Sequence, residues 1–563
     1  MSSNEVSQPI LNSPFHEPEY FWYLREGESP QKRDGRRPSF VFEPRDQRDR
    51  WTTDGRILGP SALYTGAYEL VMVNLIRDRL KAWENSGYAG ATRTTTELLT
   101  YWQDEGREKR LFYAQLEAAK TIIFLTEARQ DFLQGISVPR DEPSAERKSE
   151  GYSGFLRYAC KMATGAGKTT VMGMLTAWSI LNKVAGRGDK RFSDVVVVVC
   201  PNVTIRDRLT ELQPQRGDAS VYRTRDLVPA HLMPQLAQGR VLVTNWHIFE
   251  PQSVQTDGAK VEKRGVLVRT REAIRIGPKT TTARNKRYLT LEEYERQVSR
   301  GLLTVLDAEV DPKTGALKKV FVESARYVES DTALLQRVLG RDIGGKKNVL
   351  VLNDEAHHAY RIAEEILDEE DDEEDEDEDE LLTDKKEATV WVEGLDRIHR
   401  MRGINVCIDL SATPYFVGRV GQETNKPFPW VVSDFGLIDA IESGLVKVPQ
   451  LAARDNTGAE IPGYRNIWDW IMEPGRLTAR ERGGTRANPQ PEAILKWAQQ
   501  PITMLGSLWQ LEFDHWKSES RDREPVYILV VKNTKLAKVI HEWIAEDKAP
   551  AGLPPARLGV CRS

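Results

Sequence analysis

The fold is decided by two short segments, Lys161-Met-Ala-Thr-Gly-Ala-Gly-Lys-Thr-Thr170 and Val349-Leu-Val-Leu-Asn-Asp-Glu-Ala-His-His358. The first is a glycine-rich turn between the apolar run Phe155–Met162 and a helical pattern over Thr169–Lys183. The second is an apolar strand that ends in two adjacent carboxylates. A strand–turn–helix unit of this composition holds phosphate groups on backbone N–H donors. Together the two segments predict a magnesium-dependent nucleoside triphosphatase.

Further apolar runs alternate with helical patterns on both sides of these segments. Strands are expected at Asp194–Cys200, Val241–Thr244 and Val406–Ser411, with a helix at Thr204–Leu212. Near-continuous Val, Ile and Leu runs separated by helices are typical of parallel strands that are buried on both faces. The expected fold class is therefore α/β, with a parallel sheet covered by helices on both faces.

Changes in composition along the 563 residues divide the chain into regions. We expect an N-terminal helical and aromatic extension (1–109), an ATPase domain (110–450), a helical connector (451–520) and the incomplete start of a second domain of the same kind (521–563). Finer expectations are helices within 66–135, a loop at Ser137–Gly154, a buried strand and turn at Pro525–Thr534, and a helix at Lys535–Ala545. Two insertions, 251–345 and 364–390, interrupt the ATPase domain.

The charge pattern is uneven. The net charge is −5, but the uninterrupted acidic run Asp368–Glu380 holds 13 negative charges, so the rest of the chain carries +8 (−5 + 13). Thirteen consecutive like charges repel one another, and we expect a disordered loop there. The first insertion begins with Lys260–Arg287, which has ten Lys and Arg against two Glu. This stretch could follow a phosphate backbone or form a solvated surface, and the sequence leaves both open.

The cysteines and the apolar runs bear on the compartment. The four cysteines (Cys160, Cys200, Cys407 and Cys561) have no zinc-site or disulfide spacing. The N-terminus lacks the basic and apolar regions of a signal peptide, and the most apolar run, Val195–Cys200, is too short to span a bilayer. We expect a cytoplasmic protein with reduced thiols and no membrane partner.

The glycine-rich turn supplies the expected nucleotide contacts. Lys168 would reach the β and γ phosphates of ATP, and the hydroxyl of Thr169 would bind Mg²⁺. The strict phosphate-loop pattern has a glycine where this chain has Met162, a departure that the strand–turn–helix context offsets. The residues expected to bind the nucleotide here are Thr164, Gly165, Ala166, Gly167, Lys168, Thr169 and Thr170.

The second segment supplies the expected catalytic carboxylates. Asp354 follows a buried strand, at the sheet edge where ligands bind, and would hold Mg²⁺ largely through water. Glu355 would orient and deprotonate the attacking water. His357 and His358 lack a nearby Cys or third His, so a coupling or packing role for His357 is favoured over a metal site.

Two further segments have an ordinary structural interpretation beside a functional one. Ser411-Ala-Thr413-Pro414 follows an apolar strand, and its hydroxyls could relay the phosphate state or merely form a turn. Gln115 in the helical Phe112-Tyr-Ala-Gln115 could recognise adenine through its amide donor and acceptor, or lie on an ordinary helix surface.

In this order the segments resemble superfamily 2 helicases, and most closely the helicase (restriction) subunit of type III restriction enzymes. The resemblance is carried by Met162–Thr169, Thr244-Asn-Trp-His247, Asn353–His358, Leu410–Pro414, Trp430–Glu442 and Pro9–Phe15. It covers most of the chain and implies RecA-like domains that move along duplex DNA using ATP. A DNA methyltransferase or specificity subunit is a further partner of this family.

The resemblance also implies individual roles. Lys168, Thr169 and Asp354 would bind Mg²⁺-ATP, Glu355 would be the catalytic base, and Gln115 would read adenine. His357, Ser411 and Thr413 would couple the nucleotide to motion. Pro201, Asn202, Thr244 and Asn245 would contact DNA.

The chain departs from this family in its last part. No late motif with an arginine finger follows Val531, and no nuclease signature can be placed. An arginine finger contributes about 10³–10⁵ in rate, so slow hydrolysis by the chain alone is expected. Rival hypotheses are a nuclease-free translocase of a phage-defence or repair system, an ATP-gated DNA-binding module without hydrolysis, and, less favoured, an RNA helicase.

Overall fold

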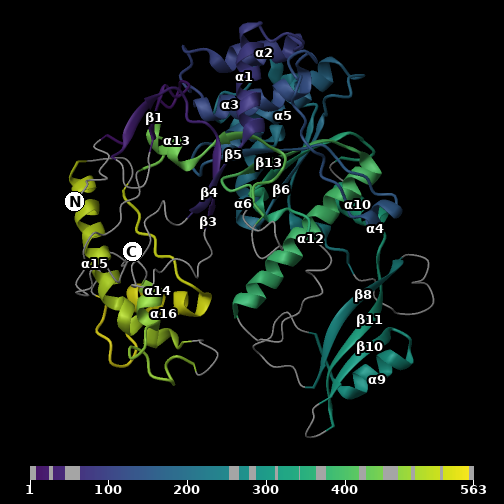
Figure 1. Cartoon of the computed structure of the whole chain (residues 1–563), viewed down its shortest axis with the longest axis vertical. Helices are drawn as coiled ribbons and strands as arrows, with labels where there is room; N and C mark the ends of the chain where they lie inside the picture. Colours follow the sequence, from purple (N-terminus) through teal and green to yellow (C-terminus); the bar gives the residue numbers. More distant parts are fainter. Residues whose placement is uncertain are drawn as a thin grey trace. The chain divides into compact units, whose positions relative to one another are not determined.

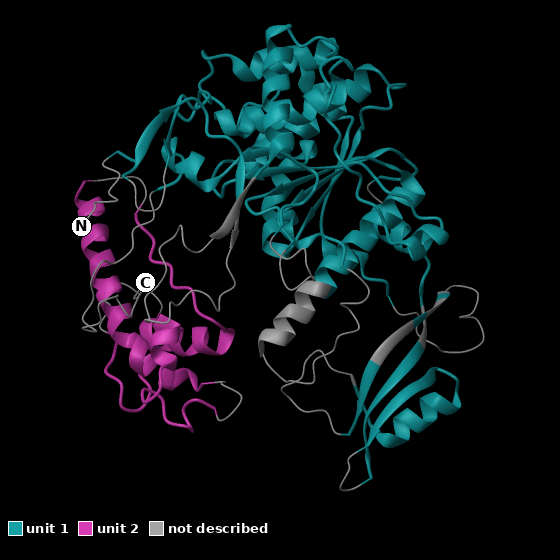
Figure 2. Ribbon diagram, in the orientation of Figure 1, with its two compact units in different colours: residues 1–448 teal, residues 449–563 magenta. Residues whose placement is uncertain are grey.

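The computed structural model describes residues 8–23, 29–44, 64–252, 265–277, 287–310, 315–340, 343–362, 376–416, 426–447, 467–483, 489–519 and 524–556. The chain forms two compact units, unit 1 (residues 1–448) and unit 2 (residues 449–563), coloured separately in Figure 2. Each unit has its own hydrophobic core, so each is described by itself.

The centre of unit 1 is a six-stranded sheet in which all neighbouring strands are parallel. In spatial order the strands are β14 (Val431–Phe435), β5 (Arg157–Met162), β13 (Ile404–Ser411), β12 (Val349–Asp354), β6 (Val195–Cys200) and β7 (Arg240–Asn245). The α/β prediction is confirmed, and the five strands predicted from apolar runs agree with the structure to within two residues at each end.

Helices cover both faces of this sheet because alternate strand residues point to opposite sides (Figure 1). Val196, Val198 and Leu352 belong to one buried cluster, whereas Val195, Val197 and Val351 belong to the other. The first cluster includes residues of α1 (Val71–Asn85), α2 (Arg93–Gln103), α3 (Tyr113–Glu127), α5 (Lys168–Ala185), α6 (Val203–Leu209), α7 (Val221–Thr224) and α8 (Met233–Leu236). The second includes residues of α10 (Asp331–Leu339) and α12 (Glu376–Arg402).

The N-terminal part is packed onto this core. The helices α1 and α2 fall in the expected N-terminal extension, yet they share the buried cluster of α3 and α5. Two antiparallel hairpins precede them, formed by β1 (Tyr20–Tyr23) with β2 (Gln31–Asp34) and by β3 (Phe40–Pro44) with β4 (Tyr64–Glu69). The helical prediction for residues 66–69 is wrong, because this segment pairs with β3.

Two short helices complete the description of unit 1, and one of them modifies an expectation. A short helix, α4 (Ala145–Ser149), lies within the predicted loop Ser137–Gly154, and the Ser144 side chain caps it. A further helix, α13 (Leu437–Glu442), follows β14. The described cysteines (Cys160, Cys200 and Cys407) are buried and free, and Cys561 lies outside the described residues.

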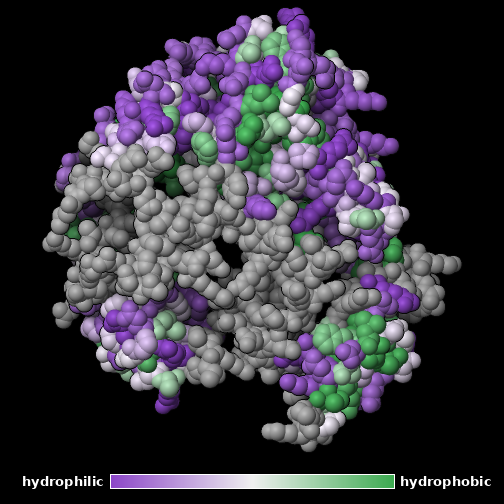
Figure 3. Space-filling model, viewed as in Figure 1, coloured by the Kyte–Doolittle hydropathy of each residue, from purple (hydrophilic) through white to green (hydrophobic). Residues whose placement is uncertain are grey.

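The insertion between β7 and β12 forms a sheet of its own. Its strands, in spatial order, are β10 (Leu303–Val310), β11 (Leu317–Glu329), β8 (Gly265–Ile276) and β9 (Arg287–Leu289), and α9 (Leu291–Ser299) packs against it. Hydrophobic residues gather on this part in Figure 3, and the exposed ones include Val305, Leu306 and Val310 of the edge strand β10. Of the basic stretch Lys260–Arg287, residues 260–264 and 278–286 lie outside the described residues.

The prediction of a disordered acidic insertion is wrong in part. The helix α12 begins at Glu376, inside the acidic run, and continues to Arg402. Glutamate favours helices, and negative charge near a helix N-terminus is stabilised by the helix dipole. The C-terminal half of α12 also packs on the sheet through Trp391, Leu395 and Ile398. Residues 368–375 of the run lie outside the described residues.

Unit 2 is helical, with α14 (Ile467–Met472), α15 (Pro491–Ser518) and α16 (Thr534–Ala545) around one core. The helix predicted at Lys535–Ala545 is confirmed as α16. The buried strand predicted at Pro525–Thr534 is wrong, because Val526, Ile528 and Val530 are 76–87% exposed. An isolated strand is unstable without neighbours, and none of the described strands pairs with this segment.

Candidate functional site

The predicted nucleotide, magnesium and coupling residues gather at one edge of the six-stranded sheet. The strands β5, β12 and β13 are neighbours and run in parallel, so their carboxyl ends meet at the same edge. The glycine-rich turn follows β5, Asp354 ends β12 and Ser411 ends β13. Ligands bind at this kind of edge in open parallel sheets.

The glycine-rich turn has the backbone of an anion cradle. Gly165 and Gly167 have φ values of +88° and +94°, which are strained for other residues. Gly167 is also the N-cap of α5, an 18-residue helix that begins at Lys168. The start of a helix and the positive end of the helix dipole favour a negatively charged group here. Thr164 and Gly165 are exposed at the turn, whereas Ala166 is buried.

The two predicted catalytic segments are in direct contact. The Nζ atom of Lys168 donates to Oε1 of Glu355, a residue 187 positions further along the chain. Both side chains are partly accessible, at 12% and 28% exposure. A triphosphate in the cradle would offer Lys168 stronger acceptors, which would release the Glu355 carboxylate.

Asp354 is a buried carboxylate that suits a divalent cation. The residue is 3% exposed, and burial raises its pKa to about 6 although the nearby Lys168 acts to lower it. A cation beside Asp354 would remove the cost of burying its charge. The described residues contain no group of three or more His, Cys, Asp or Glu able to hold a metal. Mg²⁺ fits this sparse donor set because it usually retains several water ligands.

The segment after Asp354 is held in an unusual conformation. Glu355 has φ +50° and ψ +49°, a left-handed backbone that is uncommon for a residue with a side chain. His357 then turns toward β13, and its Nδ1 lies 2.9 Å from Oγ of Ser411. Burial, together with the neighbouring His358 and Lys168, lowers the pKa of His357 to about 4, so the ring is neutral at pH 7. The Ser411 hydroxyl also accepts from the backbone N of Thr413 at 3.1 Å.

Gln115 lies against the glycine-rich turn. Its Nε2 donates to the carbonyl oxygen of Ala166 at 3.3 Å, and its Oε1 accepts from the backbone N of Phe112 at 3.0 Å. A Cβ atom on Gly167 would lie 2.0 Å from the same Nε2. The glutamine is therefore part of the turn's surroundings, with one donor and one acceptor engaged by the protein.

The predicted DNA contacts lie at the carboxyl ends of β6 and β7, at the same sheet edge. Asn202 is exposed and caps α6, since its side chain accepts from the backbone N of Ile205. Pro201 and Asn245 are half-buried. Thr244 is only 4% exposed, so its side chain offers little surface to a partner.

Sequence reasoning missed one side chain at the site. Arg225, which follows α7, donates to Oγ1 of Thr170 in the first turn of α5 and also contacts Glu211. A guanidinium beside the cradle adds positive charge where phosphates are expected. The chain offers no local signal for it, because Arg225 lies 55 residues from Thr170.

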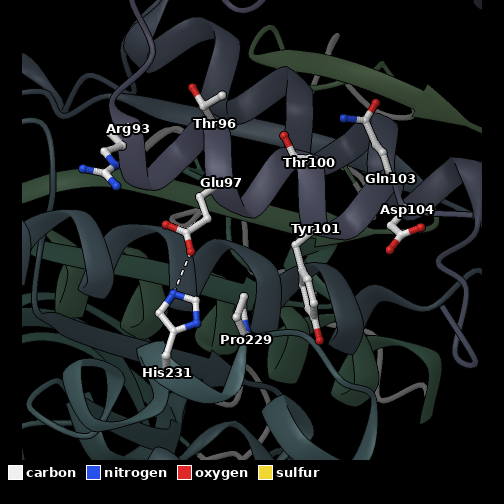
Figure 4. A pocket seen from close by; sticks show the side chains of 9 residues that line it. All are labelled: Arg93, Thr96, Glu97, Thr100, Tyr101, Gln103, Asp104, Pro229 and His231. Atoms are coloured by element: carbon white, nitrogen blue, oxygen red, sulfur yellow. Dashed lines mark hydrogen bonds and ion pairs between the residues drawn. The ribbon is translucent and has the colours of Figure 1, made fainter. Parts of the chain in front are cut away.

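A separate pocket of about 1120 Å³ lies between α2 and the segment around His231 (Figure 4). Within it, Nε2 of His231 lies 2.7 Å from Oε1 of Glu97. None of the predicted site residues lines it. The residues expected to bind nucleotide therefore lie at the sheet edge and not around this pocket.

Comparisons of the chain with protein-family models, curated proteins and solved structures found no match. In the described part of the chain, no helix combines the length and the apolar character needed to cross a membrane.

Proposed function

We propose that this chain is an ATP-dependent DNA helicase or translocase subunit of a type III restriction-like system, with its nucleotide site at the sheet edge described above. The observation that carries the proposal is the convergence of three segments on one edge. Lys168 contacts Glu355 across 187 residues, and His357 contacts Ser411 across 54. Each contact joins two of the segments that resemble helicase motifs.

Each residue then has a role. The glycine-rich turn, Lys168 and Thr169 would hold the phosphates of Mg²⁺-ATP, and Asp354 would hold the metal. When bound, Mg²⁺ would offset the negative charge of the phosphates. Glu355, once released from Lys168, accepts a proton from the attacking water. The contact of His357 with Ser411 connects Glu355 to β13 and so to the coupling segment.

Duplex DNA is the proposed polymer partner. The residues proposed for it are Pro201, Asn202 and Asn245, with Thr244 behind them. The support is their placement at the carboxyl ends of β6 and β7, beside the nucleotide edge. A DNA methyltransferase or specificity subunit is a further proposed partner, which rests on the resemblance alone.

The test is ATP turnover by the 563-residue chain with and without duplex DNA. We expect duplex DNA to stimulate turnover and Lys168→Ala to reduce it at least about 100-fold, since the lysine stabilises developing phosphate charge. A matched control is Lys183→Ala near the end of the same helix, which should leave turnover unchanged. Turnover equal in wild type and Lys168→Ala would contradict the proposal.

A second candidate is an ATP-gated DNA-binding module. It predicts that nucleotide and duplex DNA bind in a coupled manner while turnover stays at the Lys168→Ala level. Stimulation by RNA in preference to duplex DNA would instead favour the RNA helicase reading.

A further inference from the structure

A fully buried cluster of polar side chains lies within the sheet, close to the site. Its centre consists of Arg157 on β5, Asn353 on β12 and Asp409 on β13, each with 0% exposure. These three neighbouring strands are the ones that lead to the glycine-rich turn, to Asp354 and to Ser411. The cluster therefore spans the three strands that carry the proposed chemistry.

Arg157 connects the cluster to Ala359, the residue that follows the segment Asp354–His358. Its Nε donates to Oδ2 of Asp409 at 2.7 Å, and its Nη1 donates to Oδ2 of Asp141 at 2.8 Å. Its Nη2 donates to the carbonyl oxygen of Ala359 at 2.6 Å. The ring of Trp430 also packs on the guanidinium, 4.8 Å away. Every nitrogen of this buried cation thus has an acceptor.

Asp409 bonds to Asn353, the residue that precedes the segment Asp354–His358. Its Oδ1 accepts from Nδ2 of Asn353 at 2.8 Å, and its Oδ2 accepts from Nε1 of Trp430 at 3.1 Å. The amide of Asn353 in turn accepts at Oδ1 from Nε1 of Trp391 on α12, at 3.2 Å. The orientation of the Asn353 side chain is therefore fixed, because its amide nitrogen and its amide oxygen each have a partner.

The segment Asp354–His358 is consequently held on both sides. Asn353 precedes it and bonds to Asp409, whereas Ala359 follows it and bonds to Arg157. Arg361, two residues further on, forms two hydrogen bonds of 2.8 and 2.9 Å with Asp396 of α12. Between these fixed points Glu355 has its left-handed backbone, which is uncommon for a residue with a side chain.

We infer that Arg157 and Asp409 are positioning residues that hold Asp354–His358 with Glu355 in its left-handed conformation. Strained conformations persist where the surrounding structure determines them, and here directional bonds do so from both ends. Stability alone is a weak reason for such a cluster, because desolvation offsets much of the attraction in a buried ion pair. The expected effect on turnover rests on the proposed function. The expected effect on the backbone of Asp354–His358 does not depend on it.

The test compares two isosteric variants, Asp409→Asn and Glu127→Gln. Glu127 is a matched control because it too is a buried carboxylate with three donors, Oγ1 of Thr95, Nε1 of Trp178 and the backbone N of Thr92. It ends α3, twelve residues after Gln115 and thus roughly 18 Å along the helix. Both variants remove one buried charge and should lower Tm.

The two variants are distinguished by the rate of amide hydrogen exchange in the peptide spanning residues 353–361, measured without nucleotide. We expect exchange in this peptide to rise at least about tenfold in Asp409→Asn and to stay unchanged in Glu127→Gln, since only the first loses bonds that hold the segment. Equal exchange in the two variants would overturn the inference. If Asp409→Asn fails to fold, Arg157→Lys, which keeps the charge but loses donors, must show the same local rise.

Turnover provides the second readout. Asp409→Asn should lower kcat at least about tenfold with KM within about threefold, because a misplaced carboxylate affects the reaction more than binding. Glu127→Gln should retain kcat. If wild type shows no turnover while the exchange difference persists, the proposed function fails and the positioning inference stands.

Discussion

At the scale of single residues, the site combines groups whose charges compete. Lys168 contacts Glu355, and the buried Asp354 lies beside both, with its pKa raised to about 6 by burial. A nucleotide with its metal would separate these charges, since phosphates attract the lysine and the cation attracts the aspartate. Binding should therefore depend on the charge of Glu355 even though this residue does not hold the phosphates.

The variant Glu355→Gln tests this competition. Removing the carboxylate frees Lys168 and removes repulsion of the triphosphate, so the Kd for Mg²⁺-ATP should fall about tenfold, or about 1.4 kcal/mol. Turnover should fall at least about 100-fold because the proposed proton acceptor is lost. Isothermal titration and a phosphate-release assay measure the two effects. Glu150→Gln, an exposed carboxylate beside Arg147, serves as control, and weaker binding in Glu355→Gln would contradict the prediction.

His357 predicts a pH dependence of stability. Its folded pKa of about 4 lies below the ordinary value of 6.5, so the unfolded state binds the proton first as the pH falls. Stability is lost progressively below pH 6.5, by about 2 kcal/mol between pH 7 and pH 5. The measurement is the free energy of unfolding in urea at pH 7 and at pH 5, for wild type and for His357→Asn. The loss of stability between the two pH values should be larger in wild type by about 2 kcal/mol. Identical pH sensitivity in the two proteins would exclude a buried neutral His357.

At the scale of elements, prediction from sequence succeeded where one strong pattern dominated. The runs at Val195–Cys200 and Val349–Leu352 are apolar on both faces, which is typical of a covered parallel strand. Prediction from sequence failed where neighbouring strands decide whether a segment forms a strand. Val526–Val530 has the same composition, yet it is exposed and unpaired among the described strands. Likewise, the motifs predicted that Lys168 and Glu355 belong to one site, but they did not predict the contact between the two side chains. The contacts of Arg157 and Arg225 were not predicted either, because their partners are far away in the sequence.

The link between the β2–β3 connection and α3 yields a prediction at this scale. Arg36 forms a bidentate pair with Glu117 of α3 and also donates to the carbonyl oxygen of Asp434 at 3.0 Å. Both side chains are less than 10% exposed. Arg36→Met leaves a buried carboxylate short of a partner and should cost about 3 kcal/mol in the free energy of unfolding of unit 1.

The control for Arg36→Met is Lys81→Met, whose pair with Glu17 is exposed at 66% and 45%. It should change stability by less than about 0.5 kcal/mol in the same urea titration. Equal losses in the two variants would mean that the N-terminal segment is not anchored through Arg36.

At the scale of the whole molecule, the two units have separate cores. The buried clusters on the two faces of the six-stranded sheet contain residues only of unit 1, and the cluster around Ile494, Leu536 and Trp543 contains residues only of unit 2. All proposed nucleotide ligands lie in unit 1. Nucleotide binding should therefore be separable from unit 2.

A chain ending at Val448 tests this separation. Residues 1–448 should fold with one cooperative thermal transition and bind Mg²⁺-ATP within about threefold of the full chain, because the described contacts of the candidate site are made by residues of unit 1. Calorimetry and titration measure both properties. A shortened chain that folds but no longer binds nucleotide would place an essential ligand in unit 2.

The spatial order of the sheet has a consequence for biosynthesis. β5 lies between β13 and β14, so both of its neighbours are translated long after it. Arg157 and its partner Asp409 are 252 residues apart. At about 5–20 residues per second, the ribosome takes roughly 13–50 s to cover that interval. During this time the emerging polypeptide carries an apolar strand without either neighbour, a window in which protection by a chaperone would matter most.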